Sequence, residues 1–121
     1  MPHLKLEYSS NLQGTFSAQE LFAACHKVLV DTVQANLARC QSRAISYDIF
    51  HVANGDPNNA FLHLEVLLLE GRTPTQLQKL QESLQKVLKH HCQSSLLKCH
   101  VRTSLRIVEL PLSRYTLFDT Y

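Results

Sequence analysis

The sequence has only three glycines in 121 residues, and this scarcity argues against several kinds of functional site. Phosphate-binding loops and dinucleotide-binding turns need closely spaced glycines, because the backbone must approach the phosphate, and neither pattern is present. The Gly-x-Ser-x-Gly elbow of many hydrolases is also missing. The sequence therefore does not favour nucleotide-dependent or serine-hydrolase chemistry, and we expect no cofactor.

Long hydrophobic runs are also absent. No segment reaches the roughly 18 apolar residues of a membrane helix, and the N-terminus lacks the basic-then-apolar layout of a signal peptide. The four cysteines form no Cys-x-x-Cys pair, so we interpret them as small buried or half-buried thiols in a reducing compartment. We expect a cytoplasmic protein without a membrane association or a disulfide framework.

Charge and histidine spacing exclude two further classes. The net charge is +2 and the basic residues are dispersed, so no phosphate-binding stripe or nucleic-acid motif is formed. The seven histidines are scattered, and His90-His91-Cys92 has no second ligand pair at a zinc spacing. We expect neither nucleic acid nor metal as a ligand.

Apolar residues make up 45% of the chain, which is enough for one compact domain over residues 1–121. Two capping-box sequences, Ser17-Ala-Gln-Glu20 and Thr73-Pro-Thr-Gln76, predict helix starts. Behind each start, apolar residues recur at three- and four-residue steps. The first apolar stripe runs to Leu37 and the second to His91.

Four segments have strand character. They are Met1–Tyr8, Arg43–Val52, Ala60–Glu70 and Ser104–Val108. Leu62-His-Leu-Glu65 repeats the pattern of Leu4-Lys-Leu-Glu7 58 positions later, and Ser104-Leu-Arg-Ile-Val108 repeats Ser46-Tyr-Asp-Ile-Phe50 at the same offset. The chain is therefore expected to contain two repeats, about 2–53 and 60–110, followed by a C-terminal tail, 111–121.

Two strand–helix–strand repeats predict an α+β two-layer sandwich: a four-stranded mixed sheet, with parallel pairing within each repeat and both helices on one face. The other face would be bare. Strand alternation assigns a mixed set of side chains to it: Lys5, Glu7, Ser46, Asp48, His63, Glu65, Ser104 and Arg106, with Phe50, Phe61 and Leu67. An exposed face of this kind marks an interface, so we expect an oligomer. The apolar tail should dock on its own domain or on a neighbour.

Four residues are candidates for chemistry. If Met1 is removed, Pro2 becomes a secondary amine held by a strand, and it could act as a general base; otherwise it is an ordinary second residue. Arg72 precedes a predicted helix start, where backbone amides already favour anions, but it could equally be an exposed arginine that ends a strand. Arg43 and Arg39 lie near the second predicted strand and, by themselves, could be surface charges.

Four stretches carry a resemblance to a known family. They are the opening Met-Pro-His-x-x-x-Glu-Tyr-Ser, Ser42-Arg43, Ala60-Phe-Leu-His63 and Gly71-Arg72-Thr73. With the length, the order of elements and the repeat, the sequence resembles the 5-carboxymethyl-2-hydroxymuconate isomerase family of the tautomerase superfamily over nearly the whole chain.

The resemblance implies a homotrimer whose bare sheet faces meet, with Pro2 as the catalytic base. It implies enol–keto tautomerisation of a small unsaturated mono- or dicarboxylic acid of the 2-hydroxymuconate type, bound by Arg72 and Arg43; Arg39, which does not match a family residue, is a further candidate because it could reach the same space. In this reaction Pro2 must be neutral, which burial and nearby arginines would favour. Arg72 would bind a substrate carboxylate in a bidentate fork.

The sequence also departs from the family. Gln41 replaces the first arginine of an Arg-Ser-Arg run, which leaves Arg43 and, two positions before Gln41, Arg39. Thr75 and Leu77 replace an acidic and a basic residue early in the second helix. The alternative function is therefore a non-catalytic trimer that binds a small acid or a protein partner. Retention of Met1, together with Gln41, would favour this alternative.

Overall fold

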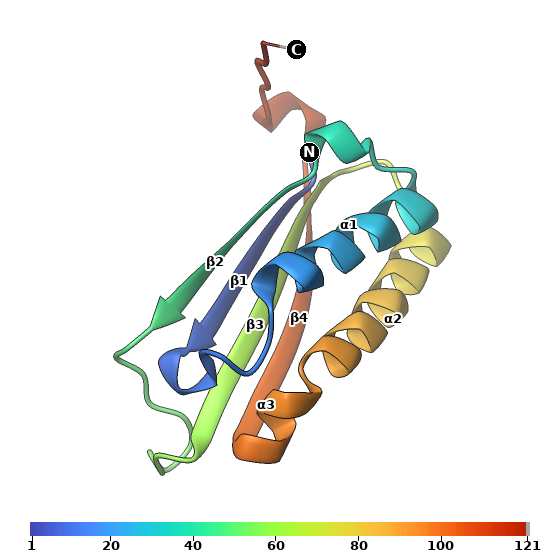
Figure 1. Cartoon of the computed structure of the whole chain (residues 1–121). Coiled ribbons are helices and arrows are strands. Elements are labelled where there is room, and N and C mark those ends of the chain that lie inside the picture. Colours follow the sequence, from blue (N-terminus) through green and yellow to red (C-terminus); the bar gives the residue numbers. More distant parts are fainter. Residues whose placement is uncertain (121) are drawn as a thin grey trace.

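The computed structural model describes residues 1–120, which form a two-layer α+β structure (Figure 1). Along the chain the strands and helices are β1 (His3–Ser9), α1 (Ala18–Val33), β2 (Gln41–Tyr47), β3 (Asn59–Leu69), α2 (Pro74–His91), α3 (Gln93–Lys98) and β4 (His100–Leu110). Three 3-10 helices lie between or after them: η1 (Ser10–Leu12), η2 (Leu37–Arg39) and η3 (Leu112–Arg114).

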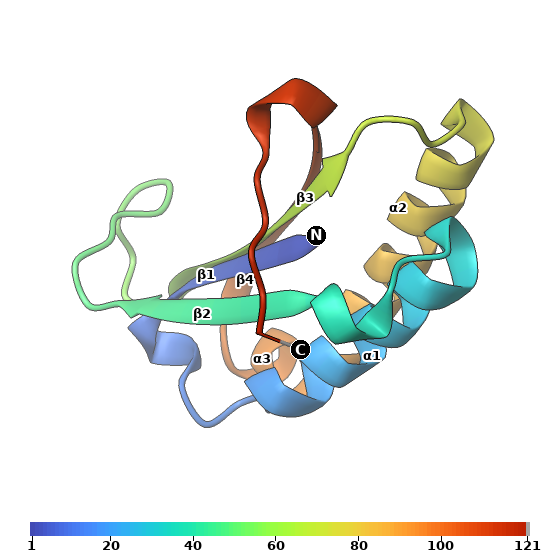
Figure 2. The same ribbon diagram turned by 90° about the horizontal axis from the view of Figure 1, so that it is seen from above.

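The four strands described in residues 1–120 have the order β2-β1-β3-β4. β1 pairs in parallel with β2 and β3 in parallel with β4, while β1 and β3 are antiparallel. Helices α1 and α2 lie side by side on one face of the sheet (Figures 1 and 2). The predicted fold class is therefore confirmed, and α3 is an addition that the sequence patterns did not predict.

The core lies between the sheet and the two long helices. In β3 the buried residues alternate with half-buried ones along the whole strand, as expected for a strand with one covered face. The fully buried leucines and valine are Leu4, Leu6, Leu12, Leu21, Leu29, Leu62, Leu64, Val66, Leu68, Leu80 and Leu84. No helix in residues 1–120 combines the length and the apolar character that a membrane crossing requires.

Both predicted helix starts are correct. The Ser17 hydroxyl accepts a hydrogen bond from the backbone amide of Glu20, and Thr73 forms a complete capping box with Gln76. The predicted end of the first helix is wrong. Helix α1 stops at Val33, and Gln34 adopts a left-handed conformation with φ of 53°. Leu37, the predicted last residue of the stripe, is therefore outside the helix and 61% exposed.

The second strand differs most from its prediction. β2 covers Gln41–Tyr47 instead of Arg43–Val52, and its register with β1 pairs Lys5 with Arg43 and Tyr8 with Ser46. Ser46 therefore faces the helix side, and Asp48 lies beyond the strand. The bare face instead receives Arg43, Ile45 and Tyr47, because directly paired residues point to the same side of a sheet.

Several charged side chains of the bare face find partners within the chain. The Tyr47 hydroxyl donates to the Glu7 carboxylate, and His63 Nδ1 lies 2.6 Å from the Ser104 hydroxyl. A guanidinium nitrogen of Arg106 lies 3.9 Å from the Glu65 carboxylate. Ile45 is nevertheless 55% exposed. The face is thus a mixed surface in which internal polar pairs alternate with exposed apolar side chains.

Candidate functional site

The candidate site residues predicted from the sequence gather at one end of the sheet. There β1 begins, the 3-10 helix η2 leads into β2, and the end of β3 turns toward α2. Figure 2 shows the start of the chain at this end, with the C-terminal tail running past it toward η2. The antiparallel pairing of β1 with β3 places the first residues of the chain beside the turn that carries Arg72.

Pro2 is fully buried, and its carbonyl accepts a hydrogen bond from the backbone amide of Gln41 at 3.1 Å. The Met1 amine donates to the carbonyl of Arg39 at 3.3 Å. Burial lowers the pKa of this amine; Cys40 opposes the effect, and the guanidinium groups of Arg39 and Arg72 lower the pKa further. The start of the chain therefore lies in surroundings that disfavour a protonated amine.

Arg72 is half-buried in the turn between β3 and α2. The turn requires Gly71, whose φ of +123° is rarely adopted by residues with a side chain. One guanidinium nitrogen of Arg72 donates to the carbonyl of Leu69 at 3.0 Å. This bond fixes the side chain, and the guanidinium has four further N–H groups that could bind an anion.

Arg39 lies in η2, where its carbonyl contacts the Met1 amine. Its guanidinium is 3.8 Å from the carboxylate of Asp119 in the C-terminal tail, and the Arg39 side chain is 54% exposed. The charges of Arg39 and Arg72 both lower the pKa of the terminal amine. The structure therefore brings these two predicted arginines near the start of the chain.

Arg43 takes a different position, on the bare face of β2. Its guanidinium donates to Nδ1 of His3 at 3.1 Å. Arg43 and the terminal amine have His3 as a shared neighbour. Burial lowers the pKa of His3 most, and the positive charges of Arg43 and of the N-terminus lower it further. Gln41 is paired directly with His3 in the register of β1 and β2.

Three residues that were not among the predicted site residues also lie at this end. His3 contacts Arg43, the Tyr115 hydroxyl lies 3.0 Å from His3 Nε2, and burial raises the pKa of the Cys40 thiol, which the amine charge partly offsets. His3 could have been identified from the opening motif. Cys40 and Tyr115 have no local signal, because only the β1–β2 pairing and the path of the tail bring them here.

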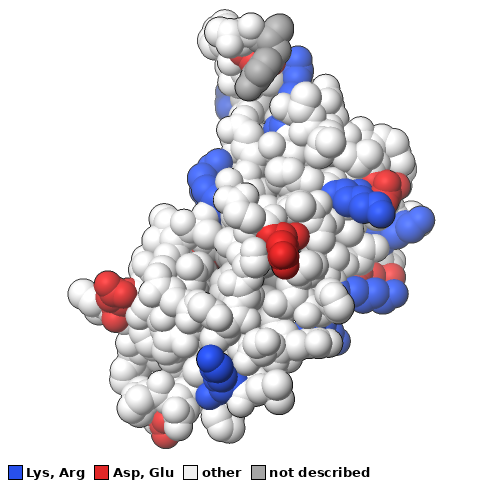
Figure 3. All heavy atoms as spheres, in the orientation of Figure 1, with Lys and Arg blue, Asp and Glu red and all other residues white. Residues whose placement is uncertain are grey.

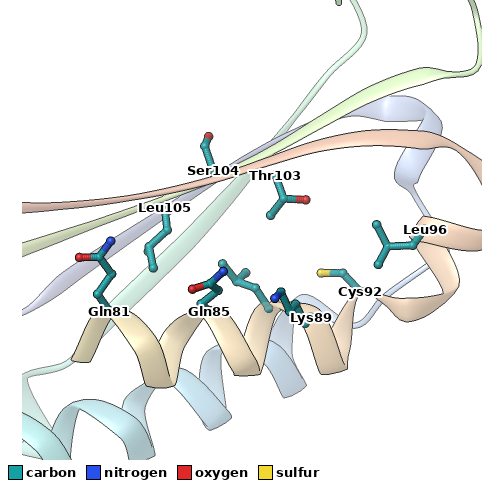
Figure 4. A pocket seen from close by; sticks show the side chains of 9 residues that line it. Gln81, Gln85, Lys89, Cys92, Leu96, Thr103, Ser104 and Leu105 are labelled. Carbon is teal, nitrogen blue, oxygen red and sulfur yellow. The ribbon is translucent and has the colours of Figure 1, made fainter. Parts of the chain in front are cut away.

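A separate cavity of about 360 Å³ lies between α2 and the edge strand β4. Figure 4 shows Thr103 and Leu105 pointing from the strand toward α2, whereas Ser104 points to the opposite face. Lys89 contributes the positive charge of its lining. The cavity is remote in the chain from the N-terminal site and brings none of the four predicted residues together.

Two surface features bear on other ligands. On the face drawn in Figure 3, basic side chains are spread out, and at the right they alternate with acidic ones. Within residues 1–120, no group of three or more His, Cys, Asp or Glu side chains is arranged to hold a metal ion.

Comparison with known proteins identifies the family. Residues 2–116 match the family model of 5-carboxymethyl-2-hydroxymuconate isomerase. The 5-carboxymethyl-2-hydroxymuconate Delta-isomerase of Escherichia coli is 28% identical over 110 residues, which cover 91% of this chain and 87% of that protein.

Solved structures show the same fold. A 5-carboxymethyl-2-hydroxymuconate isomerase from Deinococcus radiodurans R1 superposes with a TM-score of 0.89 at 24% identity, over 98% of this chain and 90% of that one. A fused 4-OT described as a symmetric trimer gives a TM-score of 0.70 at 21% identity, over 98% and 94% of the two chains. From the match over residues 2–116 and the shared fold, we conclude that the chain belongs to the 5-carboxymethyl-2-hydroxymuconate isomerase family, a family of isomerases in the tautomerase superfamily.

Proposed function

We propose that the protein is a cofactor-free enol–keto tautomerase that acts on a small unsaturated acid of the 2-hydroxymuconate type, with Pro2 as its general base after removal of Met1. The observation that carries this proposal is the position of the chain start. The amine of Met1 is partly buried near Arg39 and Arg72, and its pKa is lowered first by burial and then by these charges; after removal of Met1, the Pro2 amine would take its place at a residue that is itself fully buried. An amine in such surroundings is neutral over a wider pH range and is available to accept a proton.

The proposed reaction moves one proton and leaves the composition of the substrate unchanged. The neutral Pro2 amine takes the proton of the enol hydroxyl, the electron pair shifts along the conjugated system, and the ammonium group returns a proton to a distant carbon. When Met1 is retained, the Pro2 nitrogen belongs to a peptide bond whose lone pair is delocalised. Pro2 then has no basic nitrogen that can accept a proton.

Arginines would bind the carboxylates of the substrate. Arg72 is the first choice, because its contact with Leu69 holds the guanidinium beside the chain start and leaves other donors free. Arg39 is near enough to act on the same amine, and Arg43 would contribute from the bare face of the sheet. Together they supply up to three cations for a mono- or dicarboxylic acid.

We further propose that the protein forms a homotrimer through the bare face. The support is the exposed apolar surface of this face, with Ile45 among its residues, and the fold shared with a protein described as a symmetric trimer. Sedimentation equilibrium should give three times the chain mass; a monomer at micromolar concentration would contradict the proposal. The single-domain organisation with two repeats and the cytoplasmic location stay predictions.

The catalytic proposal is tested with three proteins that differ only at the chain start: processed protein, protein that retains Met1, and processed Pro2→Ala. Intact mass verifies each N-terminus. We expect tautomerisation of 2-hydroxymuconate by processed protein, almost none when Met1 is retained, and partial activity for Pro2→Ala, which still has a terminal amine. Equal rates in all three would assign the base to another residue.

The second candidate function is a non-catalytic trimer that binds a small acid or a protein partner. Gln41 favours it, because a neutral amide at the position of a family arginine removes one cation from the site. Processed protein that binds 2-hydroxymuconate in calorimetry but does not tautomerise it would support this alternative and refute the catalytic proposal.

A further inference from the structure

The side chain of His3 joins two residues that are far apart in the sequence. Its Nδ1 lies 3.1 Å from a guanidinium nitrogen of Arg43, and its Nε2 lies 3.0 Å from the hydroxyl of Tyr115. The rings of His3 and Tyr115 meet edge to face, with centroids 5.9 Å apart. The contacts form a chain from strand β2, through the first residue of β1, to the C-terminal tail.

The chemistry of the three groups fixes the direction of both hydrogen bonds. A guanidinium can only donate, so Nδ1 of His3 must accept from Arg43 and carries no proton. In neutral imidazole the proton is then on Nε2, which donates to the oxygen of Tyr115. The hydroxyl proton of Tyr115 is therefore not used by His3 and is free to be donated to a third group.

The surroundings of His3 favour this neutral form. Its cross-strand neighbours are Gln41 in β2 and Leu67 in β3, neither of which has a titratable side chain. The charges that act on it come from Arg43, the N-terminal amine and Lys5, all of them cationic. With burial as the largest cause, they lower the pKa of His3 below its ordinary value of 6.5.

The tail that carries Tyr115 is attached on both sides of this residue. Before it, the backbone amide of Leu112 donates to the carboxylate of Glu70 at 3.2 Å. After it, the carboxylate of Asp119 lies 3.8 Å from Arg39. Tyr115 is therefore held against His3, the residue that pairs with Gln41 in the register of β1 and β2, and Figure 2 shows the tail passing this end of the sheet.

We propose that Tyr115 is a substrate-binding residue that donates its hydroxyl proton to an oxygen of the bound acid, and that His3 is a positioning residue that holds Tyr115 and Arg43. The inference rests on the proposed function and deepens it. Because the Gln41 position offers no cation, a neutral hydroxyl donor from the tail takes over one contact to the acid. This donor suits a carboxylate oxygen and also an uncharged carbonyl or enol oxygen.

The test compares Tyr115→Phe with Tyr47→Phe in processed protein. Both changes remove a hydroxyl from a tyrosine that is half-buried, but Tyr47 donates to Glu7 near the other end of β1. A hydrogen bond to a charged group contributes about 1.5–3 kcal/mol, so KM for 2-hydroxymuconate should rise roughly 10- to 150-fold in Tyr115→Phe, with a smaller change in kcat. Tyr47→Phe should leave KM unchanged. An unchanged KM in Tyr115→Phe, with wild-type activity intact, refutes this inference alone.

The role of His3 needs readouts that a general loss of structure would not produce. In wild-type protein, KM should rise as the pH is lowered through the pKa of His3, because protonation of Nδ1 removes the acceptor for Arg43. His3→Gln, which still offers an acceptor and a donor, should retain part of the affinity and lose this pH step, whereas His3→Leu should lose both. An identical pH step in His3→Gln would refute the positioning role.

A measurement without substrate separates this inference from the catalytic proposal. The ¹⁵N shifts of His3 should show a protonated Nε2 and an unprotonated Nδ1 at neutral pH, and His3 should titrate below 6.5. Protonation on Nδ1 refutes the assigned contacts even if the enzyme is active. If processed protein neither binds nor converts 2-hydroxymuconate, the proposed function fails, and the substrate contact of Tyr115 fails with it.

Discussion

Substitution of Arg72 by alanine separates binding from stability at the candidate site. The guanidinium makes one hydrogen bond to the chain, to the carbonyl of Leu69 at 3.0 Å. Because Arg72 is only half-buried and solvent screens its charge, this bond contributes about 0.5–1.5 kcal/mol to stability, the range of an uncharged hydrogen bond. In a domain of this size the loss corresponds to a fall in Tm of only a few degrees, so the variant should fold and keep its secondary structure.

The effect on the acid should be larger. A bidentate, charge-assisted contact with a carboxylate contributes about 1.5–3 kcal/mol, which corresponds to roughly 10- to 150-fold in the dissociation constant. With Met1 present, the Arg72 charge is one of the influences, after burial, that lower the pKa of the terminal amine; the same charge would act on the Pro2 amine of processed protein, and Arg72→Ala removes it. The low-pH limit of the rate should therefore move to higher pH.

Titration calorimetry with a saturated dicarboxylic acid, which the protein cannot tautomerise, gives the affinity, and thermal unfolding of the same samples gives the stability. The pH profile of the rate gives the low-pH limit. Lys86→Ala on the exposed side of α2 is the control, because it makes the same change in net charge away from the site. If Arg72→Ala lost its cooperative unfolding transition, or if its affinity equalled that of the control, the assignment of Arg72 as a carboxylate ligand would be refuted.

Three further predictions concern the fold. Leu64→Ala, at a fully buried position of β3, should lower the unfolding free energy in urea by about 2–5 kcal/mol; a loss under 1 kcal/mol would contradict the assigned core. Burial raises the pKa of Cys25 to about 12, so iodoacetamide at pH 8 should modify half-buried Cys99 well before Cys25, with the sites identified by peptide mass. Burial lowers the pKa of His26 below 6.5, so the unfolded chain binds more protons and Tm should fall as pH drops below 6.5; an equal pH dependence in His26→Gln would contradict this contribution.

Strand alternation and helix caps were predicted correctly from the sequence, because both depend on residues that are close together in the chain. The alternation in β3 predicted its covered face, since residues two apart point the same way along a strand. The sequences Ser17–Glu20 and Thr73–Gln76 located both helix starts, because a capping side chain reaches only three residues along its own chain. The parallel pairing of β1 with β2 followed from the long helix between them. These inferences need little knowledge of the tertiary structure.

The second strand shows where local signals failed. Ile45 and Tyr47 alternate with Ser46, and the apolar pair was expected to face the helices. β2 is an edge strand, and its register with β1 turns Ser46 to the covered side and leaves Ile45 exposed. The polarity pattern alone does not assign the faces of such a strand, because its exposed apolar side chains suit an interface as well as a core.

The sequence by itself determined the family, the α+β sandwich and the candidates Pro2 and Arg72, because motifs and periodicity are properties of short segments. Only the tertiary structure decided that Arg39 and Arg72 act on one amine while Arg43 binds His3. Only the path of the tail brings Tyr115 to His3, 112 positions away in the chain. The physical reason is that such contacts depend on strand register and on the docking of a terminal segment, which are set by the packing of the whole chain and leave no periodic signal in the residues that make them.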